Sequence, residues 1–167
     1  MGVRVARIAI LLLLCLLVQV MLLPELRLFD AAPDLVLVAV IAVAYYSDPE
    51  TGAVTGFAGG FLVDLFLRTP LGVSALTFAL VGYAIALVRR GMMHHSRSTY
   101  ALITGVATLV GGGAYLLLAT LLGKEGLLSL HSLQVLVIAS LLDALIAPLI
   151  FPLTRKVLAE DHPVGMR

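Results

Sequence analysis

The sequence has no tryptophan, one cysteine and few charged residues. Charged side chains make up 13% of its 167 residues, aromatic ones make up 7%, and the formal net charge is +1. A single cysteine, Cys15, excludes an intrachain disulfide. A net charge this close to zero does not indicate a nucleic-acid-binding surface. The chain also lacks a glycine-rich phosphate loop, a Ser/His/Asp set and a Cys/His cluster, so we expect no enzyme, no cofactor and no metal site.

Hydrophobic residues are what the sequence has in excess. They make up 61% of the chain, and the mean hydropathy is +1.10. A soluble domain has about 45–50% apolar and about 25% charged residues. The composition therefore predicts a chain that lies mostly in lipid. At 167 residues, we expect one integral membrane domain over residues 1–167 and no separate soluble domain.

The apolar residues fall into six runs, and a membrane-spanning helix needs about 20 of them. We therefore predict an all-α polytopic membrane protein, a bundle of six transmembrane helices with spans at about 8–23, 32–47, 51–67, 71–88, 100–122 and 133–153. The first run has a basic start, as a signal peptide does. It lacks a directly following small-residue cleavage site, so we expect a retained helix.

Six spans place both termini on the same side of the membrane, and the basic residues predict which side. Eight lie on the side of the termini: Arg4, Arg7, Arg89, Arg90, Arg97, Arg155, Lys156 and Arg167. Three lie on the other side: Arg27, Arg68 and Lys124. Because basic residues favour cytoplasmic loops, both termini are predicted to be cytoplasmic.

A row of small residues marks the third predicted helix. Gly52, Gly56 and Gly60 recur every four residues, and Asp64 takes the next place in the row. In a helix these positions form one stripe with little side-chain volume. Such stripes let a second helix approach closely in a membrane. We expect this helix to be central in the bundle, and a homodimer through the stripe is the alternative.

Aspartates within apolar spans are candidate functional residues. Asp64 lies near the outer end of its helix, roughly 6 Å deep. It either caps a neighbouring helix or pairs with Arg68, or it anchors a binding cavity. Pro33 and Asp34 suit the first turn of the second helix, because Pro is favoured at the first helical position and an acid at the positive end of the dipole.

Asp143 lies deeper, roughly 15 Å into the sixth span. We expect a structural hydrogen bond to a serine, a threonine or Gln19 rather than a proton relay. Its depth differs from that of Asp64 by roughly 9 Å, which argues against a shared protease-like dyad.

Several of these residues together resemble the family of the rod-shape-determining protein MreD. The matching features are Pro33-Asp34, Tyr45-Tyr46, Pro49, the row from Gly52 to Asp64, Leu71-Gly72 and Ala75-Leu76. The resemblance implies a non-enzymatic subunit of the bacterial cell-elongation machinery in the cytoplasmic membrane. Its implied partner is MreC, and through MreC the actin-like MreB filament and the cell-wall synthases.

The same family also resembles the six-helix substrate-binding subunits of energy-coupling-factor vitamin transporters. A vitamin-binding subunit is therefore the alternative function. The lack of tryptophan and the low aromatic content argue against it, because aromatic faces usually hold such rings. For the leading function, the candidate site for MreC comprises Asp64, Pro33, Asp34 and Gly72, at the outer ends of the second to fourth helices.

Overall fold

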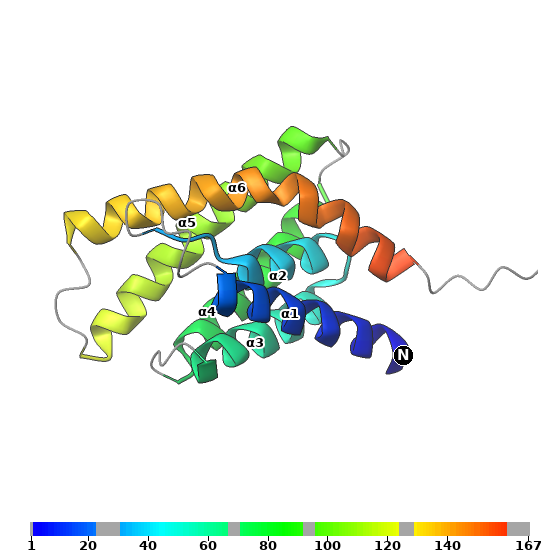
Figure 1. Cartoon of the computed structure of the whole chain (residues 1–167), viewed down its shortest axis with the longest axis horizontal. Helices are drawn as coiled ribbons and strands as arrows, with labels where there is room; N and C mark the ends of the chain where they lie inside the picture. Colours follow the sequence, from blue (N-terminus) through cyan, green and yellow to red (C-terminus); the bar gives the residue numbers. More distant parts are fainter. Residues whose placement is uncertain (1, 23–30, 67–70, 92–95, 124–128, 160–167) are drawn as a thin grey trace, which may run out of the picture.

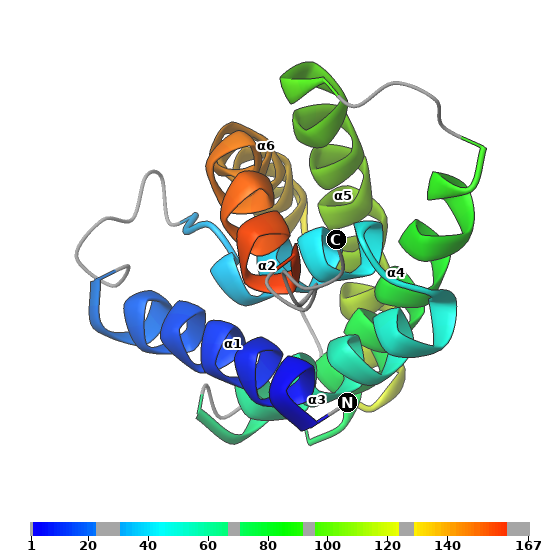
Figure 2. The ribbon, with the colours of Figure 1, turned by 90° about the vertical axis from the view of Figure 1, so that its right-hand side faces the viewer.

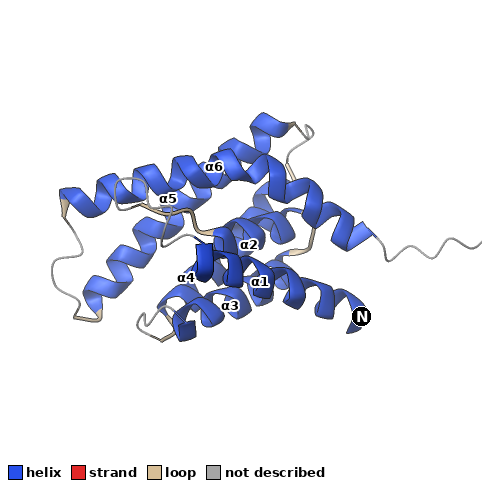
Figure 3. Ribbon diagram, viewed as in Figure 1, coloured by secondary structure: helices blue, strands red, loops and turns tan. Residues whose placement is uncertain are grey.

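The computed structural model describes residues 2–22, 31–66, 71–91, 96–123 and 129–159. In this part of the chain all regular structure is helical (Figures 1 and 3). The helices are α1 (Gly2–Leu22), α2 (Leu35–Tyr45), α3 (Pro49–Phe66), α4 (Val73–Arg89), α5 (Arg97–Leu121) and α6 (Leu130–Ala159). Each predicted span corresponds to one of them. Arg27, Arg68, Lys124 and the tail from residue 160 lie outside the described residues.

Three of the helices are long and apolar enough to cross a membrane. They are α1, α5 and α6, whereas α2 and α4 are shorter apolar helices. Helix α2 has 11 residues, or about 16 Å at 1.5 Å per residue, roughly half the thickness of the hydrocarbon core. The helix itself, from Leu35 to Tyr45, is shorter than the predicted span at 32–47.

Helix α2 is the centre of the bundle. It contacts each of the other five described helices, and every residue from Val36 to Tyr45 is buried. Figure 2 shows it between the α5–α6 pair and the layer of α1 and α3. The expectation that the third helix is central is wrong. An all-apolar helix such as α2 is buried on every side, whereas α3 exposes Val54, Phe57 and Phe61.

The basic side chains gather at one end of the bundle. Arg4 Nη2 donates to Ser47 Oγ at 3.1 Å, just after α2. Arg7 Nη1 donates to the carbonyl of Val157, near the end of α6, at 3.5 Å. The start of α1 is thereby tied to the ends of α2 and α6.

An aromatic cluster closes the same end. Tyr45 lies edge-on to Tyr100 and to Phe151, each at 5.5 Å between ring centroids. Tyr46 donates a hydrogen bond to the Tyr100 hydroxyl at 3.2 Å. The Arg89 guanidinium lies 5.9 Å from the centre of the Tyr45 ring, a favourable cation–π geometry. The ends of α2 and α4 and the start of α5 therefore meet here, and the opposite ends of these helices define the other face.

Candidate functional site

The glycine row of α3 lies directly against the backbone of α4. A Cβ added at Gly52, Gly56 or Gly60 would come within 3.0 Å of backbone atoms of the facing helix. The nearest of those atoms are the carbonyl oxygens of Gly82, Phe78 and Ser74, respectively. The two backbones touch because the row has no side chains, which is the close approach that such stripes permit.

This packing removes the row from the candidate surfaces for a second copy of the chain. Helix α4 of the same chain covers Gly52, Gly56 and Gly60. All three glycines are buried. A homodimer formed through the glycine row is therefore excluded by the fold, and the alternative that kept this row for a second copy is wrong.

Asp64 caps the start of α4. Its carboxylate accepts the N–H groups of Gly72 at 2.8 Å and of Ser74 and Ala75 at 3.3 Å each. Gly72, the N-cap residue, has a φ of +95°, which favours glycine, and supplies no side-chain cap of its own. A carboxylate from α3 thus binds the N–H groups that a helix start leaves unpaired and complements the helix dipole.

This geometry decides between the two interpretations of Asp64. The side chain is only 2% exposed, so it is not an accessible anchor. It does not line the cavity described below, and neither do Pro33 and Gly72. Of the four candidate residues for a partner site, Asp34 alone lines it. Capping of a neighbouring helix is the role that the structure gives to Asp64.

The start of α2 is capped by side chains from several helices. Asp34 is the N-cap, and its Oδ1 accepts the N–H of Leu37 at 3.1 Å. Gln19 Oε1, from α1, accepts the N–H of Val36 at 3.0 Å. Asp143 Oδ1, from α6, accepts the N–H of Asp34 itself at 2.8 Å. The first helical residue is thus Leu35, and the expected place of Pro33 at that position is wrong.

Asp143 connects this cap to a fourth helix. It has no exposed surface, and its Oδ2 accepts a hydrogen bond from Thr108 Oγ1 of α5 at 2.9 Å. Both carboxyl oxygens therefore have partners, as a buried polar group requires. Asp143 and Gln19 therefore both act on the start of α2.

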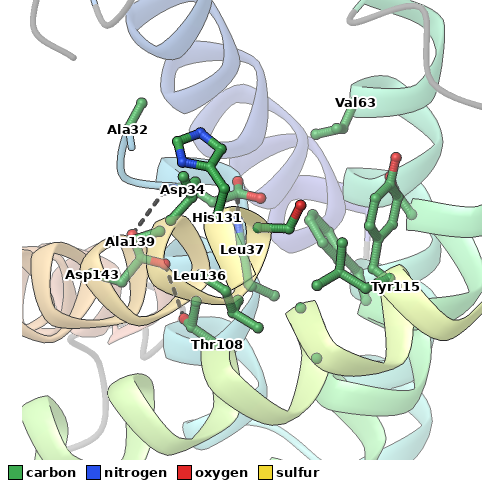
Figure 4. Close-up of a pocket in the computed structure, with 17 residues that line it drawn as sticks. Ala32, Asp34, Leu37, Val63, Thr108, Tyr115, His131, Leu136, Ala139 and Asp143 are labelled. Atoms are coloured by element: carbon green, nitrogen blue, oxygen red, sulfur yellow. Dashed lines mark hydrogen bonds between the residues drawn. The ribbon is translucent and has the colours of Figure 1, made fainter. Parts of the chain in front are cut away.

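A cavity of about 550 Å³ opens beside this cap and is lined by residues of α2, α3, α4, α5 and α6. Figure 4 shows the two carboxyl groups, Asp34 and Asp143, on one side and Tyr115 on the other. His131 of α6 lies on the same side as Asp34. Most of the remaining lining is apolar and includes Leu37, Val63, Phe78, Val135 and Leu136.

Several lining residues carry no signal in the sequence. Thr108, Tyr115 and Ser74 come from α5 and α4 and are brought together by the packing of these helices. Serine and threonine are common in membrane helices, where they also form hydrogen bonds within and between helices. Within the described ranges, no group of three or more His, Cys, Asp or Glu residues is placed to hold a metal ion.

These features define an integral membrane protein with an all-helical bundle, a tightly joined α3–α4 pair and a polar-edged cavity. The chain matches the family described as rod shape-determining protein MreD over residues 3–159. It therefore belongs to the MreD family, whose members act in cell-shape determination as part of the rod complex and are not a known family of enzymes.

The other two comparisons found no relative. No curated protein matches the chain, and no solved structure matches it. The expected likeness to the substrate-binding subunits of energy-coupling-factor transporters consequently has no structural support. The vitamin-binding alternative is likewise unsupported by any of the comparisons.

Proposed function

We propose that the protein is a non-enzymatic scaffold subunit of the cell-elongation complex that binds MreC. MreC in turn connects it to the MreB filament and to the cell-wall synthases, so that the protein supports peptidoglycan synthesis during elongation. The family match over residues 3–159 supports this role. The outward face of α3 supports a protein partner in the membrane.

That face is a stripe of large apolar side chains at helical spacing. Val54, Phe57, Phe61 and Leu65 are all well exposed, and they lie on the side of α3 away from the glycine row. Phe57 and Phe61 stack on each other, with ring centroids 6.2 Å apart and an interplanar angle of 7°. Paired aromatic rings on a helix are typical anchors of a helix–helix interface.

Helix α3 is neither among the described helices that are long and apolar enough to cross a membrane nor among the shorter apolar ones. A second apolar helix covering the stripe gives α3 a protein neighbour on both faces. We propose that the membrane segment of MreC is this helix and that Asp64 acts indirectly, by holding α4 in place behind α3.

Co-purification of MreC tests this proposal. The double variant Phe57→Ala/Phe61→Ala removes the stacked pair and is expected to reduce the retained MreC about tenfold, as the loss of an interface hot spot does. The control is Leu145→Ala/Leu149→Ala, which truncates two apolar side chains on α6 that are even more exposed than Phe57 and Phe61. Equal retention of MreC by the two double variants would refute this site.

We also propose that both termini are cytoplasmic, with the aromatic and basic end facing the cytoplasm. The support is the gathering of Arg4, Arg7 and Arg89 at one end of the bundle. Single cysteines at Ser98 and Leu130, in a Cys15→Ala background, test it in intact cells. A membrane-impermeant thiol reagent is expected to label position 130 and not position 98; the reverse pattern would overturn the topology.

A further inference from the structure

The cavity has the size and the lining of a small-molecule site. Its volume, about 550 Å³, lies within the range of about 300–1,000 Å³ found for such sites. Apolar side chains form most of the wall, and the polar groups converge at one edge. A ligand that fits this distribution has an apolar body and a polar group at one end.

The charged groups at the polar edge of the cavity indicate the sign of the charge that a ligand carries. The Asp34 and Asp143 carboxyl groups both line the cavity, and the N–H of Asp34 lies 2.8 Å from Asp143 Oδ1. Within the described residues, the other titratable side chains on the wall are His131 and Tyr115, with no lysine or arginine. Two neighbouring carboxyl groups in an apolar setting need a cation or a proton to offset their charge. A cationic ligand supplies that charge.

Ser74 adds a polar group on the α4 side of the cavity. It lines the cavity and is only 3% exposed, and its N–H donates to Asp64. A serine hydroxyl can both donate and accept a hydrogen bond, so it offers a second polar contact for a bound molecule.

We propose that the cavity binds a small amphipathic organic cation, with a protonated primary amine at Asp34, close to the buried Asp143 carboxyl group, and an apolar body against Leu37, Phe78 and Leu136. A metal ion fits less well, because the described residues hold no group of three or more suitable ligands. The amine belongs either to a free molecule or to the ethanolamine headgroup of a phospholipid. The proposal does not depend on MreC binding, which involves the opposite face of α3.

Calorimetry on the purified full-length protein in detergent tests the amine. The probe is 2-phenylethylamine, and its uncharged isostere 2-phenylethanol is the control. Wild type is expected to bind the amine and not the alcohol. Asp34→Asn and Asp143→Asn each remove a charge but keep an oxygen that caps α2, and each is expected to weaken amine binding about tenfold.

Two further variants separate the cavity from general effects on folding. Asp64→Asn removes the charge of an aspartate that does not itself line the cavity, and this variant is expected to bind the amine as wild type does. Ala139→Leu occupies the cavity without changing either carboxyl group and is expected to weaken binding. Equal amine binding by wild type, Asp34→Asn and Asp143→Asn would overturn the proposal, as would equal binding of amine and alcohol.

Native mass spectrometry distinguishes a free amine from the ethanolamine headgroup of a phospholipid. The protein is placed in nanodiscs containing equal amounts of phosphatidylethanolamine and phosphatidylcholine, then released into detergent. Retention of phosphatidylethanolamine by wild type and its loss in Asp143→Asn identifies the lipid. Binding of 2-phenylethylamine without retained phosphatidylethanolamine identifies a free amine. If neither molecule binds, the cavity is not an ammonium site.

Discussion

The two short helices α2 and α4 begin at the same end of the bundle, and aspartate side chains bind the first N–H groups of both. At α4, one carboxylate takes three N–H groups from residues 8 to 11 positions further along the chain. At α2, acceptors come from three places in the sequence, and the farthest, Asp143, is separated from Asp34 by 109 residues.

The two caps differ in how many helices they connect. The Asp64 cap fixes two consecutive helices that already touch along the glycine row, so its effect stays within the α3–α4 pair. The α2 cap involves α1, α5 and α6 and therefore fixes the position of the central helix relative to most of the bundle. Its two aspartates also line the cavity, whereas Asp64 does not.

The largest expected effect comes from separating α3 from α4. Gly56→Leu places a side chain where Cβ alone would overlap the carbonyl and the backbone of Phe78 and the N–H of Ala79. Because backbone cannot move aside as a side chain can, we expect a loss of about 4 kcal/mol or more and little folded protein in the membrane. Gly113→Leu is the matched control, since nothing lies within 4 Å of a Cβ there. Comparable accumulation of the two variants would refute the tight contact.

The next effect comes from removing the local cap. Asp64→Ala leaves three N–H groups at the start of α4 without their acceptor, and we expect a loss of about 2–3 kcal/mol in the free energy of unfolding. Hydrogen exchange should accelerate at Ser74 and Ala75 and stay unchanged at Val36 and Leu37. Asp64→Asn, which retains an acceptor oxygen, should show a smaller change at both amides. Equal acceleration at both helix starts would show that the two caps are not separate.

A smaller effect tests whether the two caps are energetically independent. Thr108→Val removes the hydrogen bond to Asp143 and should cost about 1 kcal/mol. Combined with Asp64→Asn, its cost should add within about 0.5 kcal/mol, because the two sites share no partner. Combined with Asp143→Asn, the costs should deviate from additivity by about 1 kcal/mol. Unfolding by denaturing detergent measures all three differences, and coupling between Thr108 and Asp64 would contradict the comparison.

The smallest effect concerns Asp48, an exposed aspartate just before α3 at the other end of the bundle. The pKa of its carboxyl group is lowered below 3.8 by a hydrogen bond from its own N–H and another from the Thr51 hydroxyl, at 3.0 Å. A lowered pKa in the folded state stabilises the protein above the unfolded pKa, and this stabilisation is lost as the pH falls through the folded pKa.

Thr51→Ala removes the second of these hydrogen bonds. The pKa of Asp48 should rise toward 3.8, and a small part of the decrease in stability below about pH 4 should disappear. An NMR titration of the Asp48 carboxyl carbon measures the shift. A pKa that does not move in Thr51→Ala would show that the hydroxyl makes no difference to this exposed group.

The sequence was sufficient where the determining contacts are local. Apolar runs predicted six helices close to their observed places, and the four-residue spacing predicted a surface that permits close approach. The cap formed by Asp64 was one of two alternatives, because the helix it caps begins only a few residues later. A single helical period and the chemistry of one side chain were enough for these inferences.

What the sequence could not predict depends on how distant helices pack. The apolar run of α2 looks like an ordinary span, and only its neighbours show that it is the core. The contact between Asp34 and Asp143 links opposite parts of the chain, so no spacing rule indicates it. The cavity likewise comprises residues from five helices, and its hydroxyl groups resemble those of any membrane helix.

The cap at the start of α2, which several helices share, also determines when the fold can be completed during biogenesis. The N–H of Asp34 finds its acceptor on Asp143, which the ribosome adds 109 residues later, after roughly 5–20 s of synthesis. Until α6 is inserted, a short helix with an unmatched polar start has to stay with the insertion machinery or near water, because lipid offers it no hydrogen bond. The last helix made is therefore the one that completes the first turn of the central helix, and a chain truncated before α6 presents an unfinished core to the membrane quality-control proteases.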